Sequence, residues 1–204
     1  MKKLLFYKIM LFLASFGLIS FLILFIYYIY DVWSKNKTSE NLANSYSISF
    51  LYSDNPSYST SINKYILDSK DTSSPFVIGI VKIDKLNLNY PILSEASDEL
   101  LKIAPCRFAG PFPNNVGNLC IAGHNYINNT FFAKINNLEY NDEIKIYDIN
   151  GNLTKYYVYD KKEIDSFDWS CTSQDTAGEK IITLMTCNNM NTSRIVIKAK
   201  EYIT

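Results

Sequence analysis

Three residues of the chain carry side chains that together could transfer an acyl group. Cys187 closes the apolar run Lys180–Thr186, His124 is the only histidine, and Arg194 opens the last apolar run. A thiolate can attack an amide carbonyl, and an imidazole can protonate the leaving amine and later deprotonate an incoming one. A guanidinium can hold a carbonyl or the oxyanion that develops from it. The set therefore indicates nucleophilic cysteine chemistry on an amide.

Each of the three residues, taken alone, also fits a structural role. A histidine at the end of a strand can be a turn residue, a cysteine after an apolar strand can be a small buried side chain, and an arginine at the start of a strand can be a solvated charge. Such a constellation is recognised by its geometry.

The other cysteines suggest neither a metal site nor a disulfide scaffold. Cys106, Cys120 and Cys171 form no CxxC pair with each other or with Cys187, which argues against a zinc ribbon. A metal site at the single histidine is improbable for the same reason, and we expect no metal and no cofactor. Cys106 and Cys120 could be free thiols or a bridge, and their spacing does not decide between the two.

The elements that must position these residues are short strands, which begin after Pro75. Turn signals separate them, and Asn150-Gly151 is a strong hairpin signal. Regularly spaced short strands favour a small closed β-barrel over a sandwich, so the fold class is mainly β, with one or two short helices. The predicted strands are Phe76–Ile83, Leu86–Leu93, Asn118–Ala122, Glu143–Ile149, Leu153–Asp160, Lys180–Thr186 and Arg194–Lys200. Helical turns are predicted at Ser97–Ile103 and Thr130–Ile135.

The composition argues against a nucleic-acid partner. The chain has 204 residues, with 20 basic and 20 acidic residues and a formal net charge of zero. Nucleic-acid binding requires a basic footprint that displaces counterions from phosphates, and the sequence offers none.

The N-terminal segment predicts a membrane anchor at residues 9–30. Ile9–Tyr30 contains no charge and no proline, and a helix of this length crosses the roughly 30 Å hydrocarbon core. A signal peptide has a shorter apolar core and a small-residue cleavage site, and a buried core helix has a polar face. Lysines in residues 1–8 favour a cytoplasmic N-terminus, which would leave the rest of the chain outside the cell. We interpret the polar residues 31–74 as a stalk, with short helices expected at Leu42–Leu51 and Ile62–Leu67, and residues 75–204 as the catalytic domain.

Several segments in the order of the chain resemble the sortase family. Gly117–His124 resembles its GN-x-x-I-A-G-H signature, Thr183–Cys187 matches its TLxTC signature, and Arg194–Ile197 resembles the following R-x-V-V segment. Gly79–Ile83 with Tyr90-Pro91-Ile92 is similar to the opening strands, and Phe131-Phe132 also fits. The resemblance extends from about Phe76 to Lys200.

The resemblance implies a closed eight-stranded sortase-type β-barrel and a membrane-anchored cysteine transpeptidase. Sortases cleave an LPxTG-like sorting signal between Thr and Gly through a thioacyl enzyme, then pass the acyl group to an amine of a peptidoglycan precursor or a pilin. The residues that match are Cys187 as nucleophile, His124 as acid/base, and Arg194 as the residue that contacts substrate and oxyanion. The partners would be surface proteins, the amine acceptor and the lipid bilayer, at the cell surface of a Gram-positive bacterium. A cysteine hydrolase with the same site and a non-catalytic surface module are the alternatives.

The loops indicate the class and a possible substrate groove. The short Asn188–Ser193 loop, and a segment between Tyr159 and Lys180 with no room for a long helical insertion, favour a class A- or D-like enzyme. We hypothesise that residues 163–178, which include Trp169, shape the groove, although they could equally be a structural connection. Thr186 and Asn125, beside the nucleophile and the histidine, are further candidates for substrate binding.

Overall fold

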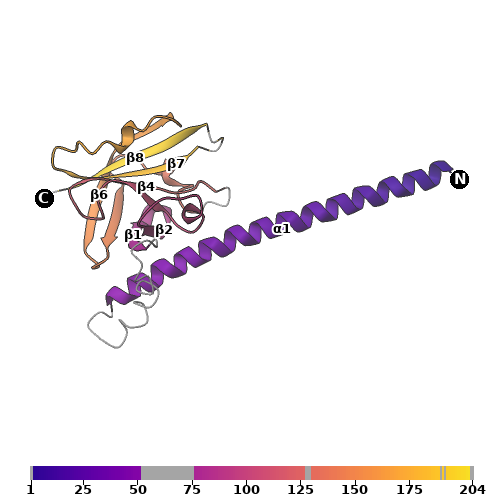
Figure 1. Cartoon of the computed structure of the whole chain (residues 1–204), viewed down its shortest axis with the longest axis horizontal. Coiled ribbons are helices and arrows are strands. Elements are labelled where there is room, and N and C mark those ends of the chain that lie inside the picture. Colours follow the sequence, from indigo (N-terminus) through magenta and orange to yellow (C-terminus); the bar gives the residue numbers. More distant parts are fainter. Residues whose placement is uncertain (1, 52–75, 127–129, 189, 191, 203–204) are drawn as a thin grey trace. The chain divides into compact units, whose positions relative to one another are not determined.

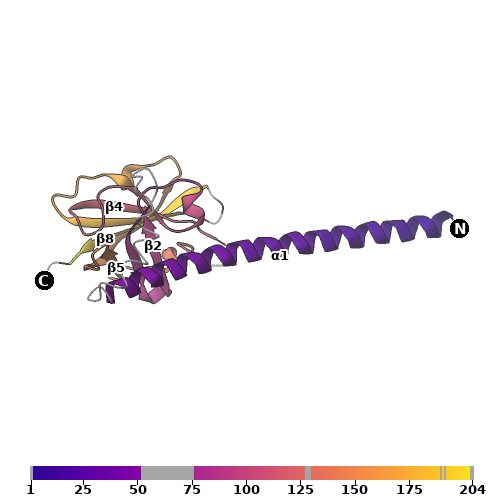
Figure 2. The same cartoon turned by 60° about the horizontal axis from the view of Figure 1, so that its bottom comes forward.

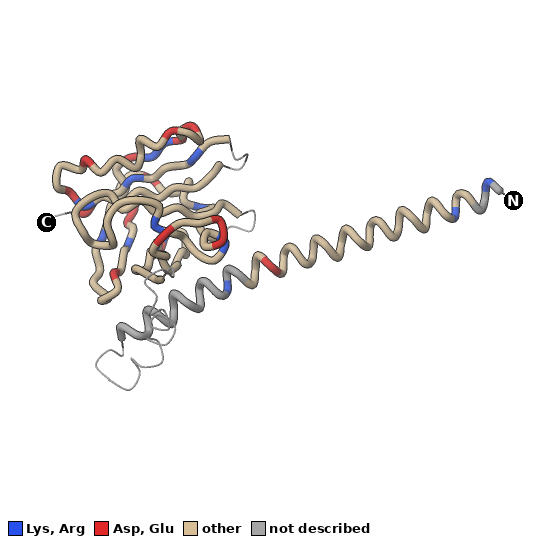
Figure 3. The backbone as a smooth tube through the Cα atoms, in the orientation of Figure 1, with Lys and Arg blue, Asp and Glu red and all other residues tan. Residues whose placement is uncertain are grey.

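The computed structural model describes residues 2–51, 76–126, 130–188, 190 and 192–202. Its N-terminal element is one continuous helix, α1 (Lys2–Leu51). The segment Phe6–Ser34 of α1 has a mean hydropathy of 2.8 and is long and apolar enough to cross a membrane. Figure 3 shows this segment almost free of charged residues, in contrast to the strands and loops of the C-terminal part. The predicted helix Leu42–Leu51 forms the end of α1, whereas Ile62–Leu67 lies outside the described residues.

The C-terminal part is a closed mixed barrel of eight strands, as predicted (Figures 1 and 2). The strand order around the barrel is β1-β2-β3-β4-β7-β8-β6-β5. Two neighbouring pairs, β2/β3 and β4/β7, are parallel, and the others are antiparallel. The strands are β1 (Val77–Ile83), β2 (Leu88–Leu93), β3 (Cys106–Ala109), β4 (Gly117–Ala122), β5 (Glu143–Asp148), β6 (Leu153–Asp165), β7 (Lys180–Cys187) and β8 (Ser193–Glu201).

Within the described part of the chain, four short 3-10 helices connect the strands: η1 (Asp84–Leu86), η2 (Leu100–Lys102), η3 (Ile135–Asn137) and η4 (Ser170–Thr172). The predicted helix at 97–103 corresponds to η2, whose Leu100 N–H donates to the Ser97 hydroxyl at 3.2 Å. The helical turn predicted at 130–135 continues into η3. Strand β3 is the one strand that the sequence did not predict.

The barrel interior is filled by apolar side chains, among them Ile121, Ile182, Leu184 and Ile197. On the outer face of β4, β7 and β8, a second buried cluster contains Met185 and Val196 and is joined by Cys171 of η4. Strands that are covered on both faces have continuous apolar sequences, which explains the apolar runs in the two signature segments.

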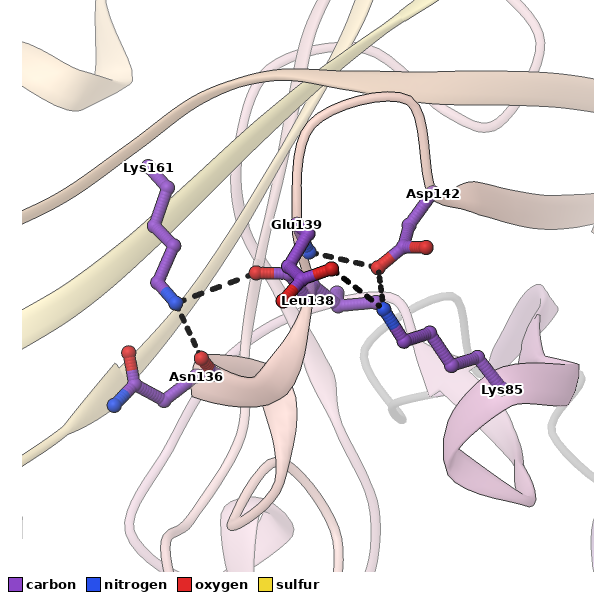
Figure 4. Close-up of polar contacts among 6 residues, drawn as sticks. All are labelled: Lys85, Asn136, Leu138, Glu139, Asp142 and Lys161. Carbon is purple, nitrogen blue, oxygen red and sulfur yellow. Dashed lines mark hydrogen bonds and ion pairs between the residues drawn. The ribbon is translucent and has the colours of Figure 1, made fainter.

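Two lysines hold the η3 turn and the start of β5 (Figure 4). Lys161 of β6 donates to the backbone oxygens of Asn136 and, at 3.3 Å, of Leu138. Lys85 forms an ion pair with Asp142 at 2.7 Å. Carbonyls at the end of a short helix lack partners within it, so Lys161 satisfies groups that the turn leaves open. This turn follows the histidine segment in the chain.

Candidate active site

The parallel pairing of β4 with β7 brings the histidine and the cysteine to one edge of the barrel. Ala122 and Met185 form the last aligned pair. His124 lies two residues beyond Ala122, and Cys187 lies two residues beyond Met185. Because the carboxyl ends of neighbouring parallel strands point the same way, both side chains belong to the same strand-end region.

The antiparallel pairing of β7 with β8 places Arg194 directly opposite Cys187. On the other side of β8, Arg194 is also paired with Ile164 of β6. Directly opposite residues of antiparallel strands carry their side chains on the same face of the sheet. The guanidinium and the thiol therefore lie on one face, and the structure brings together all three residues that the sequence singled out.

Three hydrogen bonds join the histidine segment to the cysteine strand. The Gly123 N–H donates to the Met185 carbonyl at 3.0 Å, and the buried Thr186 hydroxyl donates to the Gly123 carbonyl at 2.6 Å. The Asn125 side-chain amide donates to the Cys187 carbonyl at 3.0 Å. Thr186 and Asn125 thus connect the two reacting segments, and their predicted contact with substrate stays a prediction.

Gly123 is required by the close approach of an aromatic ring. A Cβ atom at this position would lie 2.7 Å from Cδ2 of Phe132. The Phe132 N–H donates in turn to the His124 carbonyl at 3.0 Å. The Gly-His pair of the signature therefore has a packing cause, because only glycine lets the ring support the backbone that carries the histidine.

His124 is half-buried beside an aromatic group. Its ring centroid lies 5.1 Å from that of Tyr126, which packs on Phe131 at 5.6 Å. Burial lowers the pKa of the imidazole below its ordinary value; the carboxylate of Asp98 opposes this shift and the ammonium of Lys102 adds to it. The imidazole therefore favours its neutral form more than a solvated histidine does.

Cys187 is the accessible thiol of the four. It is exposed, whereas Cys106, Cys120 and Cys171 are buried and unpaired. Burial raises the pKa of the Cys106 and Cys120 thiols to about 12, and it also raises the pKa of Cys171 above its ordinary value. Because the thiolate is the nucleophile, the three buried thiols are poor candidates for chemistry.

The connection between β6 and β7 lies against Arg194. The guanidinium carbon lies 3.9 Å from the ring centroid of Trp169, and Nη1 donates to the Ser166 carbonyl. Trp169 also stacks on Phe108 of β3, with ring centroids 5.0 Å apart and planes 9° from parallel. Trp169, predicted to bind substrate, thus contacts Arg194. Sequence reasoning did not identify Phe108 or Ser166, because their proximity arises only from the folded barrel.

A buried asparagine fixes the same connection to β4. The Asn118 side-chain amide donates to the carbonyls of Cys171 and Ser173, each at 3.0 Å, and its oxygen accepts from the Thr183 hydroxyl at 2.8 Å. Gln174 reaches back to the Asn118 backbone, donating to its carbonyl at 3.0 Å and accepting from its N–H at 3.2 Å. The asparagine of the first signature segment is therefore an anchor for a loop that is distant in sequence.

Within the described residues, no group of three or more His, Cys, Asp or Glu side chains is arranged to hold a metal ion.

Comparisons with known proteins agree on one family. The family model described as Sortase domain matches residues 81–202. Among solved structures, a Clostridium perfringens sortase D5 transpeptidase is similar with a TM-score of 0.64 and 25% identity, covering 82% of this chain and 99% of that chain. No curated protein matches the sequence.

Two further solved structures are similar in fold. The pilus-related sortase C of Group B Streptococcus has a TM-score of 0.57 and 24% identity, covering 62% of this chain and 68% of that chain. The Listeria monocytogenes sortase A has a TM-score of 0.57 and 22% identity, covering 62% of this chain and 88% of that chain.

Proposed function

Because the chain belongs to the sortase family of cysteine transpeptidases, we propose that it cleaves an LPxTG-like sorting signal between Thr and Gly and joins the released protein to an amine. The observation that carries this proposal is the register of two strand pairs. Cys187 is paired with Arg194 across β7/β8, and Cys187 and His124 both lie two residues beyond the last aligned pair of β4/β7. A nucleophile, an acid/base and a cationic hydrogen-bond donor at one strand-end region suffice for acyl transfer.

In the first half-reaction, the Cys187 thiolate attacks the carbonyl carbon of the signal's threonine, and the carbonyl oxygen takes up negative charge. Arg194 donates hydrogen bonds to this oxyanion. The His124 imidazolium gives its proton to the glycine nitrogen, the C–N bond breaks, and a thioester on Cys187 remains. The amine product leaves with the proton that the imidazole carried.

In the second half-reaction, an acceptor amine attacks the thioester. Neutral His124 removes a proton from the attacking nitrogen, the C–S bond breaks, and Cys187 leaves as the thiolate. The new amide links the surface protein to the acceptor, and His124 returns to the imidazolium. The lowered pKa of His124 favours the neutral imidazole that this step requires.

We propose that α1 anchors the enzyme by its apolar segment, with the N-terminus in the cytoplasm and the catalytic domain outside. The mean hydropathy of 2.8 over Phe6–Ser34 and the lysines that precede its apolar core support this arrangement. The substrates would be sorting-signal proteins, and the acceptor a cell-wall or pilin amine, on a Gram-positive cell. The similarity to a D5 transpeptidase along 99% of that chain supports a class D-like rather than a class C-like enzyme.

The test is a peptide-library cleavage assay with the full chain in detergent, in the presence and absence of a glycine-based amine. A sortase releases the C-terminal fragment and forms the new amide with the added amine. Mass spectrometry of trapped enzyme should find the acyl group on Cys187. Cleavage that yields only the acid, at a rate the amine does not change, would identify a hydrolase. No acylation of Cys187 by any library member would refute the proposal.

A further inference from the structure

Trp169 contacts two flat groups. The Arg194 guanidinium carbon lies 3.9 Å from the centroid of its indole, and the Phe108 ring stacks on the same indole with ring centroids 5.0 Å apart and planes 9° from parallel. The three side chains form the Arg194–Trp169–Phe108 stack, in which Trp169 remains 43% exposed. Part of the ring surface on which a substrate side chain could stack is therefore already in contact with Arg194 and Phe108.

We infer that Trp169 is a positioning residue that holds the Arg194 guanidinium toward the Cys187 site. The inference rests on the proposed function, because it assigns Arg194 to the oxyanion. It differs from a role for Trp169 as a wall of the substrate groove, in which the indole itself would contact the peptide.

The physical need for such a device follows from the arginine side chain. Arginine has several rotatable bonds, and fixing them costs conformational entropy unless a rigid partner selects one rotamer. Trp169 offers a flat face, and the Ser166 carbonyl accepts from Nη1. Neither partner carries a formal charge. The stack therefore orients the guanidinium without neutralising it, which leaves its positive charge for the developing oxyanion.

The loop that carries Trp169 has rigid support. Gln174 forms a two-way clamp with the backbone of Asn118, and the Asn118 side chain holds the carbonyls of Cys171 and Ser173. Asn118 is 1% exposed and belongs to β4, the strand that leads to His124. The same strand therefore carries the histidine segment at its end and, near its start, fixes the loop that orients the arginine.

The kinetic test compares Trp169→Ala, Trp169→Leu and Trp169→Phe in the full chain, measured by cleavage of the best library peptide. Loss of the aromatic face should lower kcat about five- to tenfold in the Ala and Leu variants and leave KM within about twofold. Phe restores a flat ring and should recover most of the lost rate. Arg194→Lys cannot stack in the same way, so adding Trp169→Ala to it should change kcat less than about twofold.

The chain provides a matched control in a second arginine–aromatic contact. The Arg107 guanidinium lies 5.2 Å from the ring centroid of Phe112, outside the proposed site. Phe112→Ala should leave kcat within about twofold of the wild type. Its thermal midpoint, compared with that of Trp169→Ala, separates loss of rate from loss of folded protein.

A second arm measures the stack without activity. In a Trp33→Phe background, Trp169 is the sole tryptophan, so its fluorescence reports one site. Arg194→Ala and Phe108→Ala each remove one contact of the indole and should each raise the acrylamide quenching constant about twofold, since collisional quenching follows exposure.

The outcomes separate the inference from the proposed function. A raised KM with unchanged kcat in Trp169→Ala, or equal rates for the Leu and Phe variants, would assign Trp169 to the groove wall and overturn the inference. An acrylamide quenching constant that Arg194→Ala leaves unchanged would overturn the inference as well. If the wild-type chain formed no amide product, the proposed function would be refuted instead. The fluorescence quenching of Trp169 would then decide whether the stack exists.

Discussion

Cys187 and Arg194 are directly opposite each other across the antiparallel pairing of β7 and β8. Such residues have Cβ atoms about 5 Å apart on one face of the sheet. The relative position of the Cβ atoms of Cys187 and Arg194 is therefore set by the backbone hydrogen bonds between the two strands. The loop from 188 to 193 joins the two strands but does not determine this pairing alone, because the register continues as far as Ile181 and Lys200.

Replacing Arg194 should reveal what its planar, charged group contributes. We expect Arg194→Ala to lower kcat/KM for peptide cleavage by about 10²-fold or more, as for loss of an oxyanion donor. Arg194→Lys keeps the charge without the planar fork and should fall between this value and the wild type. Lys200→Ala, on the same strand and in an exposed ion pair with Glu179, is the control and should leave the rate unchanged. A wild-type rate in Arg194→Ala would contradict the assignment.

Thr186 should contribute both stability and rate through its hydroxyl. Thr186→Val keeps the shape but removes the donor to the Gly123 carbonyl, which leaves that carbonyl without this partner. We expect a loss of about 1–3 kcal/mol in the free energy of unfolding, measured by denaturation in detergent, together with a severalfold lower kcat. Thr186→Ser retains the donor and should recover most of both. If Val and Ser behaved alike, the hydrogen bond would have no such role.

Gly123→Ala should displace the histidine segment. The added methyl group would lie 2.7 Å from the Phe132 ring, so the ring or the backbone must move. Overpacking of this kind costs about 1–3 kcal/mol, and a shift of the adjacent His124 should lower kcat at least tenfold. Adding Phe132→Leu makes room for the methyl group and should restore part of the stability. An equally destabilised double variant would show that the clash is not the cause.

Two charges should tune the pKa of His124 in opposite directions. Removing the Asp98 carboxylate in Asp98→Asn takes away a charge that favours the imidazolium, so the pKa should fall further. Removing the Lys102 ammonium in Lys102→Gln should raise it. Because His124 is the only histidine, one imidazole signal in an NMR titration reports the change directly.

The same two variants should shift the pH profile of the reaction. The limb of the kcat/KM profile that reports His124 should move to lower pH in Asp98→Asn and to higher pH in Lys102→Gln, because the profile follows the pKa values of the essential acid and base. The proposed reacting form pairs a thiolate with an imidazolium. The population of that pair falls when the pKa of His124 falls, so the maximal rate should drop in Asp98→Asn. Shifts in the reverse directions would contradict either the expected effects of Asp98 and Lys102 on the pKa of His124 or the proposed acid/base role of His124.

The sequence predicted seven of the eight strands, because alternating or continuous apolar residues within each strand are visible in the local sequence. It did not predict β3, which is four residues long and reads Cys-Arg-Phe-Ala, with only Cys106 buried. Its pairing with β2 rests on a single aligned pair, Leu93 with Cys106. So short a strand is defined by its neighbours in the barrel, and its own residues carry no period to detect.

The helix α1 extends well beyond the apolar segment that predicts it. Residues 31–51 are largely polar, which indicated a stalk, yet they contain no glycine or proline, and the first proline of the chain is Pro56. A helix continues until a helix-breaking residue or a capping motif ends it. The polar composition of residues 31–51 was therefore a weak indication that the helix ends there.

The sequence proposed three reacting side chains from their types and from the signatures, but it did not reveal the contacts that hold them. The Asn118–Gln174 clamp joins residues 56 apart, and the stack of Phe108 on Trp169 joins β3 to the connection between β6 and β7. Contacts of this kind depend on which strands are neighbours, which no local pattern encodes. The sequence therefore suggests which residues could react, but not which contacts position them.

The parallel register of β4 with β7 has a consequence for how this protein can diversify. The alignment of Ala122 with Met185 fixes the relative position of the strand ends that precede His124 and Cys187, independently of the connections that leave the strands. Residues 188–193 could therefore be exchanged for a segment of another length or composition without separating these two strand ends, whereas an exchange within 166–175 must keep Trp169 and its anchors if Arg194 is to stay oriented. A library restricted to residues 188–193 should give new specificities and retain the transpeptidase reaction in most of its members.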